Sequence, residues 1–471
     1  MIALSLTEIA AVTGGTIVGG DSTRQVVVDG PVVTDSREAA AGSLYVARVG
    51  ELADGHDFVE GAARRGAVAA LTTRPVAGLP CVVVPDTQAA FVALARHLVD
   101  TVPGLTVVGV TGSSGKTSTK DLLGSVLAHA GETVAPVGSY NSEVGVPLTV
   151  CRLTSSTRFL VVEMGARGIG HVAYLAQVAP PHIGVVLNVG VAHVGEFGSR
   201  EAIARAKAEL VEALAPAGLA ILNADDPAVR AMADRTRARV LLVGEAADAT
   251  IRASGIELDD AGCPHFTVTT PQGARDLHLG LVGRHHVGNA LAALAVALEC
   301  GMELEDAAVA LEAARPVSRW RMEVVERADG VTLVNDAYNA NPDSMAAALA
   351  ALERIGRDRR TWAVLGSMLE LGEDSEDLHA QVGVLAVERG VDELVVVGTV
   401  AAPMAAAAQA AAASGAAGNG IRVRAVPDAD AAEALLRAEL VPSDVVLFKS
   451  SRDAGLRLLG DKMAMSSEEL P

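Results

Sequence analysis

Cysteine is scarce in this chain of 471 residues. The four cysteines lie far apart, and no two of them form a Cys-x-x-Cys pair. This spacing favours neither a zinc site nor a disulfide framework. We therefore expect buried free thiols at the four positions, which are Cys81, Cys151, Cys263 and Cys300.

Long apolar runs are also missing. Residues 1–15 have no basic region followed by a long apolar core, and no apolar run reaches roughly 18 residues without a charge or a glycine. Neither a secretory leader nor a membrane-spanning helix is therefore expected. The sequence predicts a soluble, cytoplasmic protein without membrane insertion.

Positive charge is in short supply. The formal net charge is −19, which argues against a nucleic-acid or anionic-membrane partner, because phosphate groups would not be attracted to such a surface. An acidic protein that binds an anionic nucleotide must concentrate its positive charge locally. Half of the residues are hydrophobic, so a chain of this length can build two or three packed domains.

Lysine is rarer than arginine. The chain has 33 arginines and only five lysines. A lysine is then a candidate for a site that needs a compact primary amine, either as a point charge on phosphate or as a group that can be covalently modified. The five positions are Lys116, Lys120, Lys207, Lys449 and Lys462, and chance remains an alternative for Lys120 and Lys462.

The segment Gly109-Val110-Thr111-Gly112-Ser113-Ser114-Gly115-Lys116-Thr117 is the most informative part of the sequence. An apolar strand, 105–110, leads into it, and a helix-like stretch, 118–130, leaves it. Such a loop cradles phosphate with its backbone N–H groups, while the lysine reaches the terminal phosphates and the following hydroxyl can ligate Mg²⁺. The strict Walker pattern fails, since Val110 stands where it requires glycine. The candidate nucleotide contacts are Gly112, Ser113, Ser114, Gly115, Lys116, Thr117 and Ser118.

The alternation of apolar strands and helical stretches predicts an α/β protein of three domains. Residues 1–103 read as a small α/β domain that ends at Val102-Pro103-Gly104. Residues 104–316 predict a central domain with a mainly parallel sheet, whose ligands should bind at its carboxyl edge. Residues 317–471 predict a Rossmann-like third domain. The strands expected in the second and third domains are 106–110, 133–137, 159–163, 182–188, 219–223, 240–243, 331–335, 361–365, 393–397, 422–425 and 445–449.

Three side chains follow the phosphate loop at the expected carboxyl edge or nearby. Glu163 ends an apolar strand and is a candidate Mg²⁺ ligand, and His193 follows the next strand and can ligate a second divalent ion. Each of these alone would more often be an ordinary surface residue. Lys207 lies in the helical stretch 200–214, where a lysine is normally a solvated residue, and its rarity alone keeps it a candidate.

These motifs together resemble the Mur ligases, the ATP-dependent amide ligases that build the peptide stem of the bacterial cell-wall precursor. The segment from Gly109 to Thr117 matches that family's own loop, Gly-x-x-Gly-(Thr/Ser)-x-Gly-Lys-(Thr/Ser), which accounts for the displaced glycine. The resemblance covers essentially the whole chain, in order. It implies a three-domain fold with a UDP-binding first domain, a phosphate-loop ATPase domain and a Rossmann-like ligase domain.

The resemblance also implies the metal site. It makes Thr117 and Glu163 ligands of Mg²⁺, and His193 a ligand of a second ion, so that ATP and two Mg²⁺ ions are the expected cofactors. It matches Lys207 to a lysine that CO₂ carbamylates. This modification turns an amine into a carboxylate-like ligand, which a guanidinium cannot readily become. Lys116, Lys207 and His193 are the expected catalytic residues.

The nucleotide contacts implied by the family lie further along the chain. Asn289, in Gly283-Arg284-His285-His286-Val287-Gly288-Asn289, matches the residue that contacts adenine. Arg319 matches an arginine that contacts the nucleotide, although its Ser318-Arg319-Trp320-Arg321 setting is atypical. Asp336 matches the acid near the ATP ribose.

Segments in all three domains indicate which reaction the resemblance implies. Thr34-Asp35-Ser36-Arg37 and Asp54-Gly55-His56-Asp57-Phe58 resemble the UDP-sugar-binding domain shared by the ligases that add the third residue and the terminal dipeptide. The segments 141–147, 163–166 and 335–342 resemble the dipeptide-adding member. A monomer acting on UDP-MurNAc-tripeptide and D-Ala-D-Ala is therefore expected, with substrate contacts from Ser36, Arg37, Asn141, Tyr338, Asn339 and Asn341.

Other interpretations remain at this point. A folylpolyglutamate synthase or the ligase that adds the third residue would share the fold but use another substrate. A non-catalytic nucleotide-binding protein and a phosphate-loop NTPase acting on nucleic acid are alternatives of other classes. Departures from the family pattern, at Arg48, Ser142 and Ser367, bear on the substrate contacts.

Overall fold

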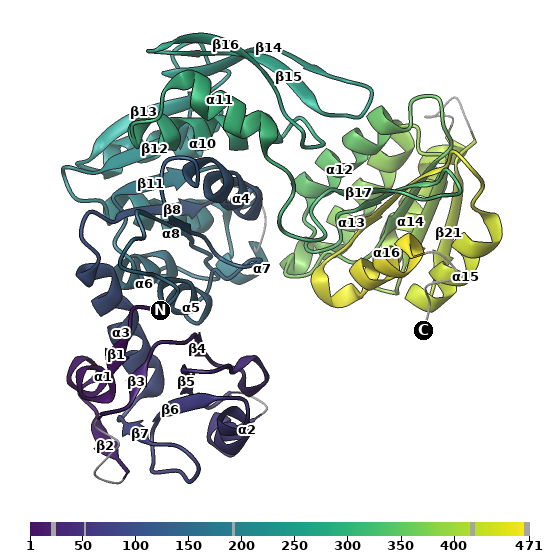
Figure 1. Cartoon of the computed structure of the whole chain (residues 1–471). Helices are drawn as coiled ribbons and strands as arrows, with labels where there is room; N and C mark the ends of the chain where they lie inside the picture. The colour runs from purple at the N-terminus through teal and green to yellow at the C-terminus, as the bar shows by residue number, and fades with distance from the viewer. Residues whose placement is uncertain (20–24, 51–52, 191–193, 415–419, 466–471) are drawn as a thin grey trace.

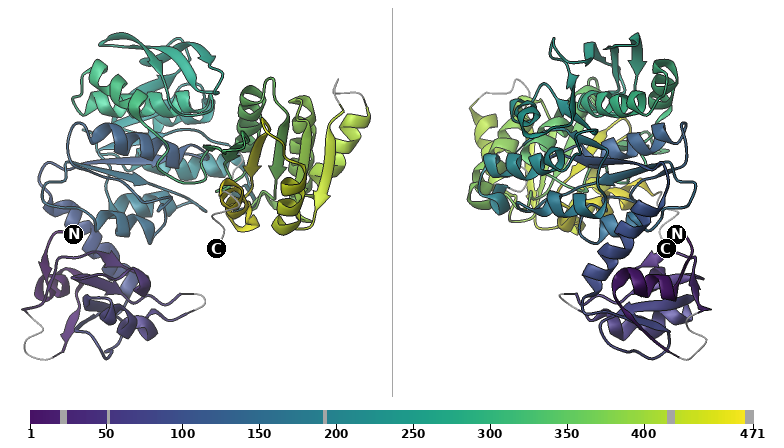
Figure 2. Two further views of the ribbon diagram at one scale, coloured as in Figure 1. Left: turned by 45° about the vertical axis from the view of Figure 1, so that its right-hand side comes forward. Right: turned by 90° about the vertical axis from the view of Figure 1, so that its left-hand side faces the viewer.

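The computed structural model describes residues 1–19, 25–50, 53–190, 194–414 and 420–465. The chain folds into three bodies, each built around its own β-sheet (Figures 1 and 2). The N-terminal body, drawn in purple, lies against one end of the central body, and the C-terminal body, drawn in green and yellow, lies beside the central body. The predicted three-domain α/β architecture is confirmed. Within the described ranges, no helix is both long and apolar enough to cross a membrane.

The N-terminal body contains a five-stranded sheet of order β2-β7-β6-β5-β4 and a two-stranded ladder, β1-β3. Only β2 runs antiparallel within the larger sheet. Strand β6 was not predicted, because its run Ala-Val-Ala-Ala-Leu-Thr is rich in alanine, which is depleted in strands. The strands are β1 (Leu4–Ser5), β2 (Thr16–Val18), β3 (Val27–Val28), β4 (Val32–Val33), β5 (Ser43–Val46), β6 (Ala67–Thr72) and β7 (Cys81–Val83), and the helices are α1 (Leu6–Thr13), η2 (Ser36–Glu38), η3 (Gly55–Phe58), α2 (Val59–Arg64) and α3 (Thr87–Thr101).

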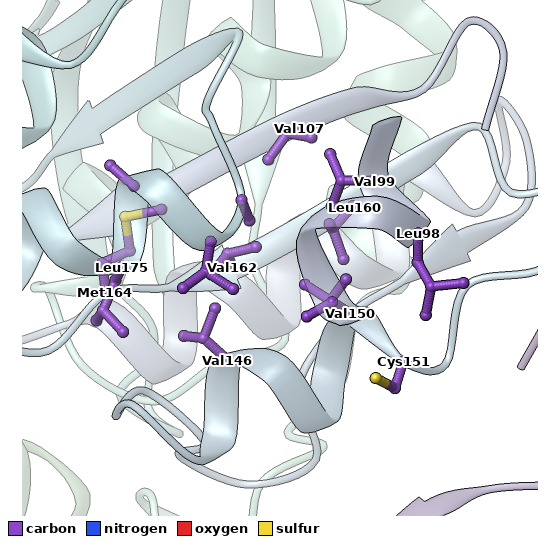
Figure 3. Close-up of a cluster of buried hydrophobic side chains, with 14 of the residues drawn as sticks. Leu98, Val99, Val107, Val146, Val150, Cys151, Leu160, Val162, Met164 and Leu175 are labelled. Atoms are coloured by element: carbon purple, nitrogen blue, oxygen red, sulfur yellow. The ribbon is translucent and has the colours of Figure 1, made fainter. Parts of the chain in front are cut away.

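Helix α3 joins the N-terminal body to the central one. Asp86 caps its first turn by accepting from two backbone N–H groups, and its buried side chains recur at helical spacing along one face. The helix packs on α1 on one side and on α5 and α6 on the other. Figure 3 shows Leu98 and Val99 of this helix among Val150 and Leu160 of the central body. The two bodies therefore share one hydrophobic core.

The central body has a nine-stranded sheet of order β16-β15-β14-β13-β12-β11-β8-β10-β9. The strands from β9 to β14 are parallel, as predicted, and β14, β15 and β16 add an antiparallel edge. The elements are β8 (Thr106–Thr111), α4 (Lys116–Leu127), β9 (Thr133–Val134), α5 (Gly145–Val150), β10 (Phe159–Glu163), α6 (His171–Val178), β11 (Ile183–Val186), α7 (Val194–Phe197), α8 (Arg200–Glu212), β12 (Leu219–Asn223), α9 (Pro227–Arg230), η4 (Ala231–Arg235), β13 (Arg239–Gly244), β14 (Ile251–Leu258), β15 (Pro264–Thr270), β16 (Gly273–His278), α10 (His286–Glu299) and α11 (Leu304–Ala313).

The C-terminal body has a six-stranded sheet of order β17-β18-β22-β19-β20-β21, in which only β17 is antiparallel. Two separate hydrophobic clusters fill its two faces. The elements are β17 (Glu323–Glu326), β18 (Thr332–Asn335), α12 (Pro342–Ile355), β19 (Thr361–Leu365), η5 (Gly372–Asp374), α13 (Ser375–Glu388), β20 (Glu393–Val397), α14 (Ala402–Ala413), β21 (Arg422–Val426), α15 (Ala429–Glu439), β22 (Val445–Lys449), η6 (Arg452–Ala454) and α16 (Leu456–Ala464).

Hydrogen bonds join the C-terminal body to the central one. The Lys120 ammonium donates to the Ser318 hydroxyl at 3.2 Å, and the Ser318 N–H donates to Asp121 at 3.1 Å. Nearer the sheet edges, the Gly195 N–H donates to the Glu370 carbonyl at 3.2 Å. Lys120 is thus a buried anchor for the segment that leads into the third body, where the sequence had left chance open.

Candidate functional site

The phosphate loop runs from the end of β8 to the start of α4, where two close approaches demand glycine. Gly115 has φ of +79°, and a Cβ atom there would lie 2.6 Å from Asn289 Oδ1. A Cβ atom on Gly112 would lie 3.0 Å from the Leu187 Cβ atom. Neighbouring residues thus leave no room for a side chain at Gly112 or Gly115, which explains why glycines stand at these positions of the loop. Without side chains, the loop backbone can turn its N–H groups toward a ligand.

Asn188, which follows β11, holds this loop in place. Its carbonyl accepts from the Ser113 N–H at 3.1 Å, and its side-chain oxygen accepts from the Ser114 N–H at 2.9 Å. Asn188 lies at the end of a predicted strand, but no role was predicted for it from the sequence. Its position next to a glycine-rich loop on the neighbouring strand was the signal that could have indicated one.

Lys116 folds back over its own loop. Its ammonium donates to the Gly112 carbonyl at 2.7 Å and reaches the Ser113 carbonyl at 3.4 Å. Burial lowers the pKa of this lysine, and the nearby Glu163 carboxylate partly offsets that effect. A phosphate group at the loop would offer the ammonium a charged partner in place of two neutral carbonyls.

Thr117 and Glu163, the two side chains predicted to bind Mg²⁺, lie within hydrogen-bond distance of each other. The Thr117 hydroxyl donates to Glu163 Oε2 at 3.0 Å, and the amide of Asn141 donates to Glu163 Oε1 at 2.7 Å. A hydroxyl and a carboxylate are hard oxygen donors of the kind that Mg²⁺ selects. Across the described ranges, no cluster of three or more His, Cys, Asp or Glu side chains could hold a metal. Two oxygen donors suit an ion that keeps several of its waters and binds substrate phosphates.

Lys207 lies on α8 with its side chain in the wall of the same cavity. It is 5% exposed, and its ammonium makes no hydrogen bond or ion pair to any other described residue. Desolvation, followed by repulsion from Lys116, lowers its pKa well below the usual lysine value. Such a site favours an uncharged amine. His193, the other predicted ligand on this side, lies outside the described residues.

The predicted base-binding residue, Asn289, lies beside the loop on α10. A smaller cavity of about 100 Å³ opens next to it, bounded by Gly244, His285 and Gly288 among others. The buried Asn289 amide lies 3.5 Å from the ring of His286, and its side-chain oxygen approaches Gly115. The loop and this smaller cavity are therefore adjacent.

Asp336, the predicted ribose contact, follows β18 and lines the main cavity. Its carboxylate accepts from Lys449 at 2.6 Å and from the Met322 N–H at 3.1 Å. Lys449, at the end of β22, also donates to the Asn339 carbonyl at 3.1 Å and is fully buried. Burial lowers its pKa, which the Asp336 charge opposes. In the sequence, Lys449 was noted only because lysine is rare in this chain. The structure shows that Asp336 and the Asn339 carbonyl bind its ammonium.

Replacing Lys449 by methionine should disturb the Asp336 end of the site. The substitution keeps the length of the side chain but leaves the Asp336 carboxylate without its closest partner, which costs about 1–3 kcal/mol for a buried polar group. We expect KM for ATP to rise about tenfold, with a smaller change in the acceptor KM. Steady-state kinetics with each substrate varied in turn would measure this split. An equal rise in every KM would instead indicate a general loss of structure.

Arg319 and Arg321, in the segment that leads into the C-terminal body, contact different parts of the protein. Arg319 donates to Asp461 on α16 at 2.8 Å and is not among the residues that line the cavity. Arg321 lines the cavity, lies over the Tyr338 ring at 4.5 Å and reaches the Thr117 hydroxyl at 3.3 Å. Residues 320 and 322 both have positive φ, at 60° and 50°. The role predicted for Arg319 stays a prediction, while the geometry favours Arg321 for a nucleotide contact.

The comparison of Arg321→Ala with Arg319→Ala separates these two assignments. We expect Arg321→Ala to lower kcat/KM about 100-fold, as the loss of a charged donor near transferring phosphate does elsewhere. Arg319→Ala should stay within about threefold, since exposed ion pairs contribute little. The reverse order of effects would restore the sequence-based assignment. Phosphate release at varied ATP would measure both.

The remaining predicted substrate residues are divided between the bodies. Tyr338, Asn339 and Asn341 line the cavity with Asn141, and Asn341 also caps α12 by accepting from the Ser344 N–H at 2.8 Å. Ser36 and Arg37 are on η2 in the N-terminal body and are not among the residues that line the cavity. The Arg37 side chain is 81% exposed and pairs with Asp35 at 2.6 Å, and this pair lowers the pKa of the Asp35 carboxyl to about 2.

The cavity measures about 1300 Å³ and lies between the central and C-terminal bodies. Its walls bring together the phosphate loop with Ser118, the Thr117–Glu163 pair, Lys207, Asn289 and, from the C-terminal body, Asp336 and Lys449.

Residues 110–297 match the family model of the Mur ligase middle domain, and residues 320–452 match that of the Mur ligase glutamate ligase domain. A UDP-N-acetylmuramoyl-tripeptide–D-alanyl-D-alanine ligase of Mycobacterium tuberculosis (strain ATCC 25618 / H37Rv) is 47% identical, with 98% of each chain covered. The chain belongs to the Mur ligase family.

Other Mur ligases extend the comparison. The enzyme of the same name from Escherichia coli (strain K12) is 36% identical over 84% of this chain and 86% of its own. A crystal structure of MurF from Acinetobacter baumannii superimposes with a TM-score of 0.86 at 31% identity, covering 98% of this chain and 99% of that one. The MurF ligase of Thermotoga maritima, solved in complex with ADP, has a TM-score of 0.78 at 29% identity and covers 92% and 97%.

Proposed function

We propose that this chain is an ATP-dependent ligase that joins D-Ala-D-Ala to the terminal carboxylate of UDP-MurNAc-tripeptide in peptidoglycan precursor synthesis. The observation that carries the proposal is the shared cavity, in which a phosphate loop and an oxygen-rich metal site face the loops of a second α/β body. Relatives that bear this enzyme name match the chain over nearly its full length. Because both bodies line this one cavity, the amine acceptor and the phosphate donor can bind next to each other in it.

The chemistry needs charge neutralisation more than a nucleophilic side chain. ATP phosphorylates the tripeptide carboxylate, the D-Ala-D-Ala amine attacks the acyl phosphate, and collapse of the tetrahedral species gives the amide, ADP and phosphate. Lys116 and the loop N–H groups bind the polyphosphate, and Arg321 supplies a second cation beside Thr117. Closure of the C-terminal body over the phosphate loop would keep water from the acyl phosphate.

Two Mg²⁺ ions complete this proposal. Thr117 and Glu163 would hold one of them, and His193 with a carbamylated Lys207 would hold the other. Bound Mg²⁺ supplies charge stabilisation to the phosphoryl group and to the developing tetrahedral species. The Lys207 amine is buried and makes no hydrogen bond or ion pair within the described part of the chain, which supports the carbamate because CO₂ reacts with the uncharged form.

The UDP-sugar and the base of ATP are assigned to residues outside the proposed metal site. We place the UDP-sugar on the N-terminal body near Ser36 and Arg37, and the base of ATP beside Asn289. We propose domain boundaries after residues 103 and 316 and a monomeric enzyme. We also propose a cytoplasmic location, since ATP, a UDP-sugar peptide and a dipeptide are water-soluble substrates.

Phosphate release from MgATP by the purified protein tests the function directly. UDP-MurNAc-tripeptide should be supplied with and without D-Ala-D-Ala, and the product mass should be determined. Release that depends on both substrates, with a new pentapeptide product, supports the proposal. ATP binding without release with this acceptor would exclude the assigned substrates and move the question to free amino acids or folates as substrates of the same fold.

A further inference from the structure

The acceptor of the proposed reaction carries a carboxylate that no residue of the site has yet been given to bind. D-Ala-D-Ala has its reacting amine at one end and a negative charge at the other. A ligase that selects a dipeptide over its uncharged analogues needs a cation for that charge, placed on the body that faces the phosphate loop. The identification of the residue that binds this carboxylate rests on the proposed function.

Most cations that line the cavity already have partners. Lys116 is bonded to carbonyls of its own loop, Lys449 to Asp336, and Arg321 to the hydroxyls of Thr117 and Ser139. Arg167 lies 4.0 Å from Glu370. Within the described ranges, two cavity-lining cations make no side-chain hydrogen bond or ion pair, and these are Lys207, which is buried in the central body, and Arg452.

Arg452 begins η6, directly after the central strand β22 of the C-terminal sheet. The carboxyl ends of three adjacent parallel strands, β18, β22 and β19, face the cavity through the loops that follow them. Ligands of parallel sheets bind at such edges. The guanidinium is exposed, so a substrate carboxylate can reach it.

Ser451 supplies a second donor next to this arginine. It lines the cavity and is 4% exposed. Its hydroxyl accepts from the Leu369 N–H at 2.9 Å, and its own proton has no acceptor among the described residues. Its N–H donates to the Ser367 carbonyl at 2.9 Å, which fixes the backbone from which Arg452 extends. Ser367, a departure from the family pattern, thus contributes through its backbone.

We propose that Arg452, with the Ser451 hydroxyl, binds the terminal carboxylate of the acceptor dipeptide. This contact orients the dipeptide so that its amine faces the acyl phosphate at the phosphate loop. Arg452 is then a specificity-determining residue on the C-terminal body, separate from the residues that hold ATP.

A carboxamide analogue of the acceptor tests this proposal. Kinetics should be measured with D-Ala-D-Ala and with D-alanyl-D-alaninamide, for the unmodified enzyme and for Arg452→Gln, at saturating MgATP and UDP-MurNAc-tripeptide. We expect the unmodified enzyme to prefer the carboxylate about 100-fold in kcat/KM, and Arg452→Gln to lose most of that preference through a higher acceptor KM. KM for ATP should stay within about twofold, because the Arg452 side chain makes no hydrogen bond or ion pair to the described residues assigned to the nucleotide.

Two further variants sharpen the result. Arg389→Gln removes an exposed arginine of the same body that pairs with Glu353, and it should leave the preference intact. Arg167→Gln should also leave it intact, and loss of the preference in this variant but not in Arg452→Gln would overturn the proposal. Full preference in Arg452→Gln would overturn it as well. No ligation of D-Ala-D-Ala by the unmodified enzyme would instead overturn the proposed function, and the role of Arg452 with it.

Discussion

Lys116→Met should abolish nearly all ligase activity while leaving the fold intact. The methionine keeps the length of the side chain and removes the only charge that the phosphate loop itself carries. Groups that neutralise a transferring phosphoryl group contribute about 10³-fold or more to kcat in comparable sites, so a fall of that size is expected. The ammonium now lies against the Gly112 carbonyl at 2.7 Å, which places it at the loop beside a neutral acceptor that a phosphate oxygen can replace. Phosphate release in the presence of all three substrates would measure the loss.

Lys462→Met is the matched control for this substitution. Lys462 is half exposed, pairs with Glu433 at 3.3 Å within the C-terminal body, and is not among the residues that line the cavity. It should retain activity within about twofold, since exposed ion pairs contribute little. Equal activity of Lys116→Met and the unmodified enzyme would refute the phosphate-binding role of the loop lysine, provided that both proteins melt at similar temperatures.

Lys207→Ala should lower kcat about 10³-fold, because a metal would lose one of its few protein ligands and the charge stabilisation it provides, worth several kcal/mol. The alanine also leaves a space next to the metal site. A small carboxylic acid such as acetate or formate can enter this space and replace the carbamate oxygens, so partial recovery of activity is expected. Kinetics at increasing acid concentration would measure it.

A spectroscopic measurement separates the carbamate from a merely structural lysine. The unmodified protein equilibrated with ¹³C-bicarbonate should show a carbamate carbon resonance that is absent from Lys207→Ala. Lys116→Met should keep this resonance and should not be rescued by carboxylic acids. Full activity of Lys207→Ala without added acid would exclude the carbamate role.

The sequence predicted the sheets best where strands are buried on both faces. Strands β10, β12, β19, β20 and β22 have the predicted bounds, because each is a nearly continuous apolar run in a parallel sheet. The antiparallel hairpins β14, β15 and β16 were not predicted. Their side chains alternate between buried and exposed positions only in part, since they form an edge with one face in solvent.

The candidate site divides in the same way. The loop from Gly112 to Thr117 and its partner Glu163 could be predicted from the sequence, because a strand, a glycine-rich turn and a helix fix the loop locally, and parallel strands end at one edge. The sequence could not predict which of Arg319 and Arg321 lines the cavity. The chain passes through left-handed backbone at Trp320 and Met322, and the two arginines, only two residues apart, reach different partners, Asp461 and Thr117.

The sequence by itself thus determined the α/β class, the phosphate loop and the strand-end carboxylate, which depend on short stretches of chain and on the alternation of apolar segments. Tertiary structure alone decided which cations share the cavity and which are occupied elsewhere. Lys449 reaches Asp336 across more than a hundred residues, and the Arg452 side chain, which follows the neighbouring strand end, makes no hydrogen bond or ion pair to another described residue. Such pairings depend on which strands become neighbours in a sheet, and local patterns carry no record of that order.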